Sequence, residues 1–65
     1  MIKIFMSEES LCIREYPKSM ENDIIENLEK GTYFKASEKI IIEGTKEQRY
    51  DALNILSRYF DIEII

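Results

Sequence analysis

Apolar and polar positions alternate along the first part of the chain. Isoleucine or methionine occupies every second position of Ile2–Met6, and the alternation resumes over Leu11–Tyr16. A period of two is typical of strands that bury one face. The polar residues 7–10 between the two segments favour a turn, so we expect a hairpin. Pro17 has no amide hydrogen to donate to a ladder and is expected to end the second strand.

The pattern then changes to the helical period. Ser19 is a favourable N-cap residue, and acidic residues follow it, where they suit the N-terminus of a helix. Gly31 comes directly after Lys30 and suits the left-handed conformation in which many helices end. The segment between these two signals predicts a first helix. One stripe of that helix contains Met20, Ile24, Ile25 and Leu28.

The second half of the chain repeats the order of strands and helix. Short strands are expected over residues 32–36 and 39–43, and the three consecutive isoleucines of the latter favour a well-covered strand. Thr45 lies three residues before Gln48, which is the spacing of a capping box. A second helix is therefore expected over residues 46–59. Its broad apolar arc contains Ala52, Leu53, Ile55, Leu56, Tyr59 and Phe60.

The last segment, Asp61–Ile65, alternates again and predicts a closing strand. The expected order is strand, strand, helix, strand, strand, helix, strand, which is an α+β fold. The last six elements match a ferredoxin-like (split βαβ) arrangement with an extra N-terminal strand. Both helices are then expected on one face of a small antiparallel sheet. The alternative omits the strand at 32–36 and leaves a three- or four-stranded sheet. Residues 1–65 form a single domain by length.

Composition bears on the cellular location of the protein and on the character of its surface. The chain has 9 basic and 13 acidic residues, for a net charge of −4, and the acidic residues are scattered along it. They either keep the surface hydrated or engage a basic partner. Cys12 is the only cysteine, so no internal disulfide can form and a cytoplasmic location is expected. No segment resembles a signal peptide or a membrane span, so no membrane association is expected.

The residue types argue against catalysis. The chain lacks histidine, the commonest general base and metal ligand. Cys12 therefore has no activating histidine, and its position in a strand predicts a small core or edge residue. Gly31 and Gly44 are isolated, so no phosphate-binding loop is indicated. We expect a protein that is not an enzyme and binds neither metal nor cofactor.

Two features keep nucleic-acid binding as an alternative. The segment IIIEGTKEQRYDAL, about a fifth of the chain, resembles the strand and helix of KH-type RNA-binding domains. This resemblance implies RNA binding. The GXXG loop with which that family clamps the nucleic-acid backbone is absent. Independently, aromatic residues on the sheet are expected to offer stacking surfaces, with Arg14, Lys35 and Lys39 nearby. These aromatic residues are Tyr16, Tyr33, Phe34 and Tyr50.

The leading hypothesis is a non-enzymatic protein-binding module, an adaptor or an inhibitor. Small acidic proteins of this character include inhibitors that phages and mobile elements direct against the nucleic-acid-handling machinery of the host. An acidic surface would then face a basic partner, with a tyrosine as an additional contact. The candidate residues are Glu8, Glu9, Glu21, Asp23, Glu26, Glu29 and Tyr50. A further alternative is a structural subunit that forms a homodimer through the edge strands of the sheet.

Overall fold

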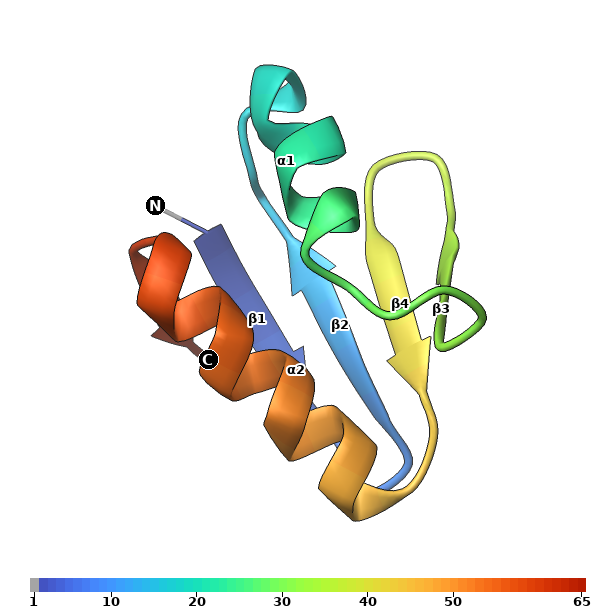
Figure 1. The fold of residues 1–65 in the computed structure, drawn as a ribbon. Helices are drawn as coiled ribbons and strands as arrows, with labels where there is room; N and C mark the ends of the chain where they lie inside the picture. Colours follow the sequence, from blue (N-terminus) through green and yellow to red (C-terminus); the bar gives the residue numbers. More distant parts are fainter. Residues whose placement is uncertain (1) are drawn as a thin grey trace.

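The structure is a computed structural model, and it describes residues 2–65 (Figure 1). Every strand and helix expected from the sequence is present, although the first helix is about half as long as expected. The elements are β1 (Ile2–Met6), β2 (Ser10–Arg14), a 3-10 turn (Lys18–Met20), α1 (Glu21–Glu26), β3 (Tyr33–Lys35), β4 (Ile40–Glu43), α2 (Lys46–Tyr59) and β5 (Ile62–Ile64). No helix in this described range is both long and apolar enough to cross a bilayer.

The five strands form one mixed sheet in the order β3-β4-β2-β1-β5. All neighbours are antiparallel except β1 and β5, which are parallel. The ferredoxin-like order expected from the sequence is therefore not observed, because that order would place β5 next to β2. The prediction of an antiparallel sheet is also wrong for β1 and β5, which are parallel. Because a short turn closes the β1–β2 hairpin at low entropic cost, β1 occupies the free edge of β2 and leaves β5 only the outer edge of β1.

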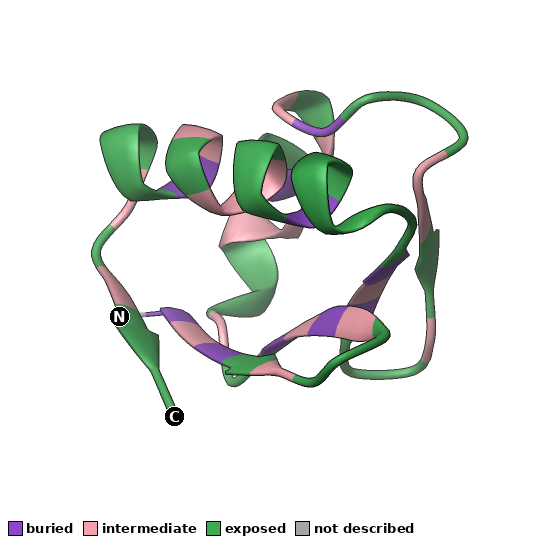
Figure 2. Cartoon of the chain, turned by 90° about the horizontal axis from the view of Figure 1, so that it is seen from below, coloured by how far each residue is buried: buried purple, intermediate pink, exposed green. Residues whose placement is uncertain are grey.

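Both helices lie on the same side of the sheet, as expected (Figure 2). The residues of β1, β2 and β4 that point toward the helices are buried, except the half-buried Met6 at the end of β1, and their neighbours along each strand are not buried. Most of the core is therefore made of isoleucines from the three central strands. The buried apolar residues are Ile2, Ile4, Leu11, Ile13, Ile24, Leu28, Ile40, Ile42 and Leu56.

The N-terminus of α2 has the predicted capping box. The amide of Gln48 donates to the Thr45 hydroxyl over 3.1 Å, and the Thr45 amide donates to the Gln48 side chain over 2.9 Å. Gly44 allows this closure, because a Cβ there would overlap the Gln48 side-chain oxygen. The capping box therefore fixes where the chain leaves β4 and enters α2.

The first helix is shorter than expected, and the prediction that Ser19 caps it is wrong. The amide of Met20 donates to the carbonyl of Pro17, so Ser19 lies inside a 3-10 turn and the α-helix begins only at Glu21. At the other end the Asn27 side chain donates to the Asp23 carbonyl over 2.8 Å. That bond satisfies a carbonyl that a longer helix would use. Gly31 has the expected left-handed conformation, with φ of 86°.

Candidate functional site

The face of the sheet that points away from the helices carries a continuous row of apolar side chains. The strand register places Phe34 beside Ile41, Ile41 beside Cys12 and Cys12 beside Phe5. Paired residues in neighbouring strands point to the same face, so these four residues cross β3, β4, β2 and β1 in one line. We call this row the open-face stripe. Phe5 is 47% exposed and Phe34 is 49% exposed.

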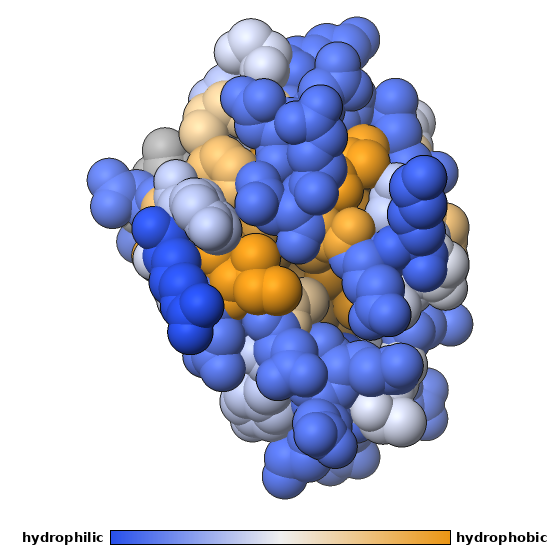
Figure 3. Space-filling view, in the orientation of Figure 1, coloured by the Kyte–Doolittle hydropathy of each residue, from blue (hydrophilic) through white to orange (hydrophobic). Residues whose placement is uncertain are grey.

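No other element within residues 2–65 covers this face (Figure 2). The opposite side of the molecule differs. Charged and polar side chains cover most of the helical side, and apolar side chains reach its surface between the two helices (Figure 3). On the open face the strand positions two residues from the stripe are polar or charged, among them Lys3, Arg14 and Glu43. The open-face stripe is therefore an apolar line between polar flanks, a kind of surface that is often an interaction site.

Charged residues border the stripe on both sides. On one side the register pairs Arg14 with Lys3 and Lys3 with Glu63. Lys3 forms a 3.1 Å ion pair with Glu15, and the hydrogen bond to Glu15 raises the pKa of Lys3. Arg14 makes no ion pair with any described residue. On the other side Ser10 pairs with Glu43, which is exposed. On the strands that the stripe crosses, one flank therefore has the unpaired cation Arg14 and the other the unpaired anion Glu43. Glu63, an exposed anion, lies beyond Lys3 on the outer strand β5.

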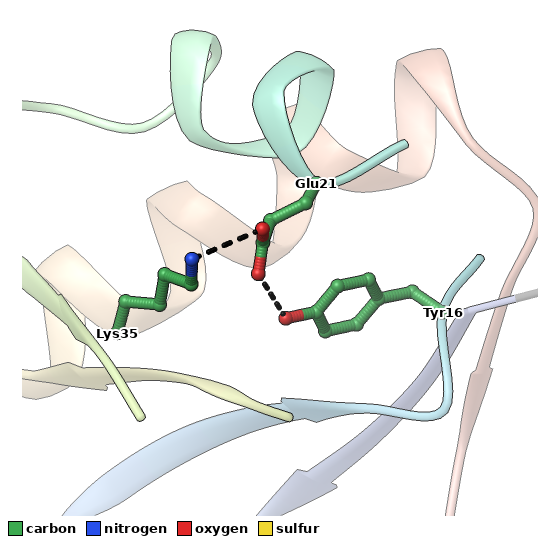
Figure 4. Close-up of polar contacts among 3 residues, drawn as sticks. All are labelled: Tyr16, Glu21 and Lys35. Atoms are coloured by element: carbon green, nitrogen blue, oxygen red, sulfur yellow. Dashed lines mark hydrogen bonds and ion pairs between the residues drawn. The ribbon is translucent and has the colours of Figure 1, made fainter. Parts of the chain in front are cut away.

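One predicted site residue, Glu21, is held inside the fold. Its two carboxylate oxygens accept a 3.0 Å hydrogen bond from the Tyr16 hydroxyl and contact the Lys35 ammonium at 3.2 Å (Figure 4). The bond from Lys35 lowers the pKa of Glu21, and Tyr16 assists it. Burial, together with the bond to Glu21, raises the pKa of Tyr16 to about 12. These contacts tie α1 to the end of β2 and to β3, so Glu21 is a structural residue here.

The remaining acidic candidates fall into two groups. Asp23, Glu26 and Glu29 are exposed on α1 and directly after it. Glu8 and Glu9 are exposed in the β1–β2 turn, at the opposite end of the sheet (Figure 1). The structure therefore does not bring the predicted acidic residues together on one continuous face.

Tyr50 and Glu8, by contrast, border one depression of about 460 Å³, together with Met6, Ser7, Lys46 and Arg49. The Lys46 ammonium lies 5.9 Å from the centre of the Tyr50 ring. Tyr50 is 46% exposed, so it remains available for contact.

Arg49, which sequence reasoning missed, is the buried member of this group. It is only 7% exposed, and its Nη1 donates to the Glu8 carbonyl over 2.8 Å. Its Nε is buried and has no hydrogen-bond partner among residues 2–65. Arg49 lies seven residues before the buried Leu56, and this spacing was the signal that could have placed it on the apolar side of α2.

A second, larger depression of about 650 Å³ lies at the end of β2 and includes the turn between β3 and β4. Its charged lining is balanced, with three cations and three anions, so it does not indicate one class of ligand. The charged residues are Arg14, Lys18 and Lys39, with Glu15, Glu21 and Glu38. Over the described part of the chain no group of three or more candidate ligands could hold a metal ion.

The aromatic residues expected to form a stacking surface also separate. Phe34 lies on the open face, whereas Tyr33 pairs with the buried Ile42 and points toward the helices. Tyr16 packs against the core, and Tyr50 lies on α2. Phe5 was not among the candidates, although its position between Ile4 and Met6 places it on the open face.

Comparison with known proteins does not assign the chain to a family. No family model matches it, and neither a curated protein nor a solved structure is similar to it. The candidate function therefore rests on the surfaces described above.

Proposed function

We propose that the chain is a non-enzymatic protein-binding module, an adaptor or an inhibitor, and that the open face of the sheet is its contact surface. The open-face stripe is the observation that supports this proposal. About half of each phenylalanine ring, or roughly 100 Å² of aromatic surface, stays in contact with water at Phe5 and at Phe34. Covering that area is worth about 2.5 kcal/mol per ring, which favours a partner with an apolar surface.

The exposed acidic residues contribute a second part of the proposal. Asp23, Glu26 and Glu29 would repel nucleic acid and attract a basic protein surface. This is the property expected of an inhibitor from a phage or mobile element that occupies a basic groove of a host nucleic-acid-handling machine. We also propose a cytoplasmic location, because the single cysteine leaves the domain without a disulfide.

The test is affinity capture from a native lysate with paired variants. The bait proteins are the wild type, Phe34→Ser on the open face, and Tyr59→Ser as a matched control on α2. Tyr59 is 66% exposed, so its replacement removes a comparable aromatic surface from the other side of the molecule. The proposal expects a stoichiometric protein that survives nuclease, is lost with Phe34→Ser and is kept with Tyr59→Ser. Equal capture by all three baits would refute the assignment of the surface.

The acidic part of the proposal has its own variant. Reversal of Asp23, Glu26 and Glu29 to lysine is expected to weaken capture, because these acidic residues would attract a basic partner toward the domain, while the far-UV circular dichroism spectrum stays unchanged. These three side chains are exposed, so their replacement leaves the core intact. Full capture by the reversed variant would remove the acidic residues from the interface and leave the open face as the contact surface.

A second candidate function, binding to single-stranded RNA or DNA, has one observation in its favour. Phe5 and Phe34 are exposed on the same sheet face, and Arg14 lies beside the row that they share. Aromatic rings on a sheet with a neighbouring cation are typical of single-strand recognition. The rings are three strands apart, however, roughly 14 Å, and the net charge is −4. Anisotropy titrations with labelled oligonucleotides at low salt distinguish the two functions, since nucleic-acid binding weakens steeply as salt is added.

A further inference from the structure

We propose that the partner for the open face is a second copy of this chain, related by a two-fold axis that runs along the open-face stripe. This inference rests on the proposed function, because it names the protein that the contact surface binds. It differs from association through the edges of the sheet. The edge strands β3 and β5 have only three residues each, and such short edges offer few free ladder groups to a partner strand.

The apolar residues match under this symmetry. A two-fold axis along the stripe places every residue of the stripe opposite its own counterpart, so Phe5 faces Phe5 and Phe34 faces Phe34 of the second copy. Face-to-face sheets pack about 10 Å apart, which leaves room for the two layers of side chains to interdigitate. Phe5 and Phe34, at the two ends of the stripe, would then enclose Ile41 and Cys12 at its centre.

The area of the face suits a modest dimer. Five strands span roughly 19 Å, and five residues of a central strand span roughly 17 Å. The projected face is thus roughly 300 Å², and two such faces give about 600 Å² before the protruding side chains are counted. Specific interfaces bury about 1,200 Å² or more, so this face lies at the small end of the range. The dimer is therefore expected to dissociate on dilution.

The charges on the two flanks select this axis. Rotation about the stripe exchanges the flanks, so Arg14 of one copy faces the Ser10–Glu43 row of the other. Rotation about an axis parallel to the strands would instead bring each flank onto the same flank of the other copy, so that the Arg14 side faces the Arg14 side and the Glu43 side faces the Glu43 side. Like charges facing each other across an interface are unfavourable, so the observed pattern favours the first arrangement.

Arg14 and Glu43 cannot form this contact within one copy. Glu43 pairs with Ser10, and Ser10 lies four residues before Arg14 on the same strand. The two backbone positions are therefore separated by roughly 13 Å along the strand and by one strand spacing across it. Cys12 and Ile41 of the open-face stripe lie between the two residues, so a direct contact of their charged groups is expected between copies and not within one copy.

The test is sedimentation equilibrium over a concentration series on the wild type and four variants. Arg14→Glu and Glu43→Arg each place like charges opposite each other in the dimer, and the double reversal R14E/E43R restores both pairs. Phe34→Ser removes apolar contact from the stripe. Arg58→Glu is the control, because Arg58 is exposed in the last turn of α2 on the helical side. Circular dichroism establishes that each variant is folded before its association is compared.

The expected result is a dimer whose dissociation constant rises about tenfold or more with each single reversal and returns to within about threefold of wild type in the double reversal. Arg58→Glu is expected to leave the dissociation constant unchanged, and Phe34→Ser to raise it. Glu43→Arg is the most discriminating variant. It makes the chain less acidic, so a general charge effect would strengthen association, whereas the proposed contact predicts weaker association.

A wild type that stays monomeric up to millimolar concentration overturns the dimer. A double reversal no tighter than the single variants overturns the axis and with it the proposal. These failures are distinguishable from failure of the proposed function. If the wild type is monomeric and captures a different protein in a manner that Phe34→Ser abolishes, the dimer proposal is refuted and the proposed contact surface stands. If the wild type is monomeric and Phe34→Ser leaves capture unchanged, both proposals are refuted.

Discussion

Replacement of the buried Arg49 by methionine and by alanine separates the contribution of its charge from that of its stem. The guanidinium donates to the Glu8 carbonyl and joins the N-terminus of α2 to the β1–β2 turn. Its Nε is buried without a hydrogen-bond partner in the described chain, and no carboxylate within residues 2–65 forms an ion pair with it. Methionine keeps an unbranched apolar stem and removes the whole polar head.

The two polar effects of Arg49→Met nearly offset each other. Loss of a hydrogen bond from a charged group costs about 1.5–3 kcal/mol, and removal of an unsatisfied buried donor regains about 1–3 kcal/mol. The free energy of unfolding is therefore expected to change by less than about 1 kcal/mol. Arg49→Ala also removes two buried methylenes, about 0.8 kcal/mol each, and leaves space behind. The alanine variant is expected to be about 2 kcal/mol less stable than the methionine variant.

Urea unfolding followed by circular dichroism measures both variants against the wild type. A domain of this size is expected to unfold in one transition, which allows the free energies to be compared directly. The reasoning fails if Arg49→Met is as unstable as Arg49→Ala. That result would mean that the bond to Glu8 outweighs the unsatisfied Nε, and that the guanidinium itself holds the turn against α2.

Three other predictions concern local features. Thr45→Ala should lower the free energy of unfolding by about 1 kcal/mol in urea unfolding, because it removes one bond of the capping box, whereas Thr45→Ser should retain it. Gly31→Ala should cost about 1–2 kcal/mol by backbone strain alone, since φ is 86° and no described atom lies within 4 Å of the added Cβ; replacement by D-alanine should be tolerated. The pKa of Tyr16 is raised from 10.0 to about 12, so its stabilising contribution is present below pH 10 and is lost as the pH rises through 12. The pKa of Glu21 is lowered from 4.5, so its contribution is present above that value and is lost as the pH falls further. When the pH is raised from 9 to 11.5, Tyr16→Phe should lose less of its free energy of unfolding than the wild type does. Equal losses would contradict the assignment of this pH dependence to Tyr16.

Local patterns predicted the elements because each signal acts over a few residues. The capping box at Thr45 and Gln48 gave α2 its observed start, and the alternation of Ile2–Met6 gave β1 its observed bounds. Ser19 misled the reasoning for the same reason. Its preference for the N-cap position is local, and the turn that follows Pro17 decides the start of α1 instead.

The strand order could not be predicted from local patterns of this kind. Whether β5 pairs with β2 or with β1 depends on which edge is free after the hairpin has formed, and no residue of Ile62–Ile64 specifies the neighbour. The open face was only partly predictable. The alternation of side chains along β1 places Phe5 on the face that points away from the core. The stripe exists, however, only because the strand register aligns Phe5, Cys12, Ile41 and Phe34. Register is a property of strand pairs, which one strand's pattern does not contain.

The parallel pairing of β1 with β5 also determines when the fold can be completed. It joins residues 2–4 to residues 62–64, a contact between segments about 60 residues apart in the chain. The two hairpins and α2 depend on contacts between near neighbours and can form quickly. The outer ladder edge of β1 stays unpaired until β5 arrives. We therefore expect the amides of β5, and the following Ile65 amide that donates to the Ile4 carbonyl, to gain protection from hydrogen exchange last during refolding.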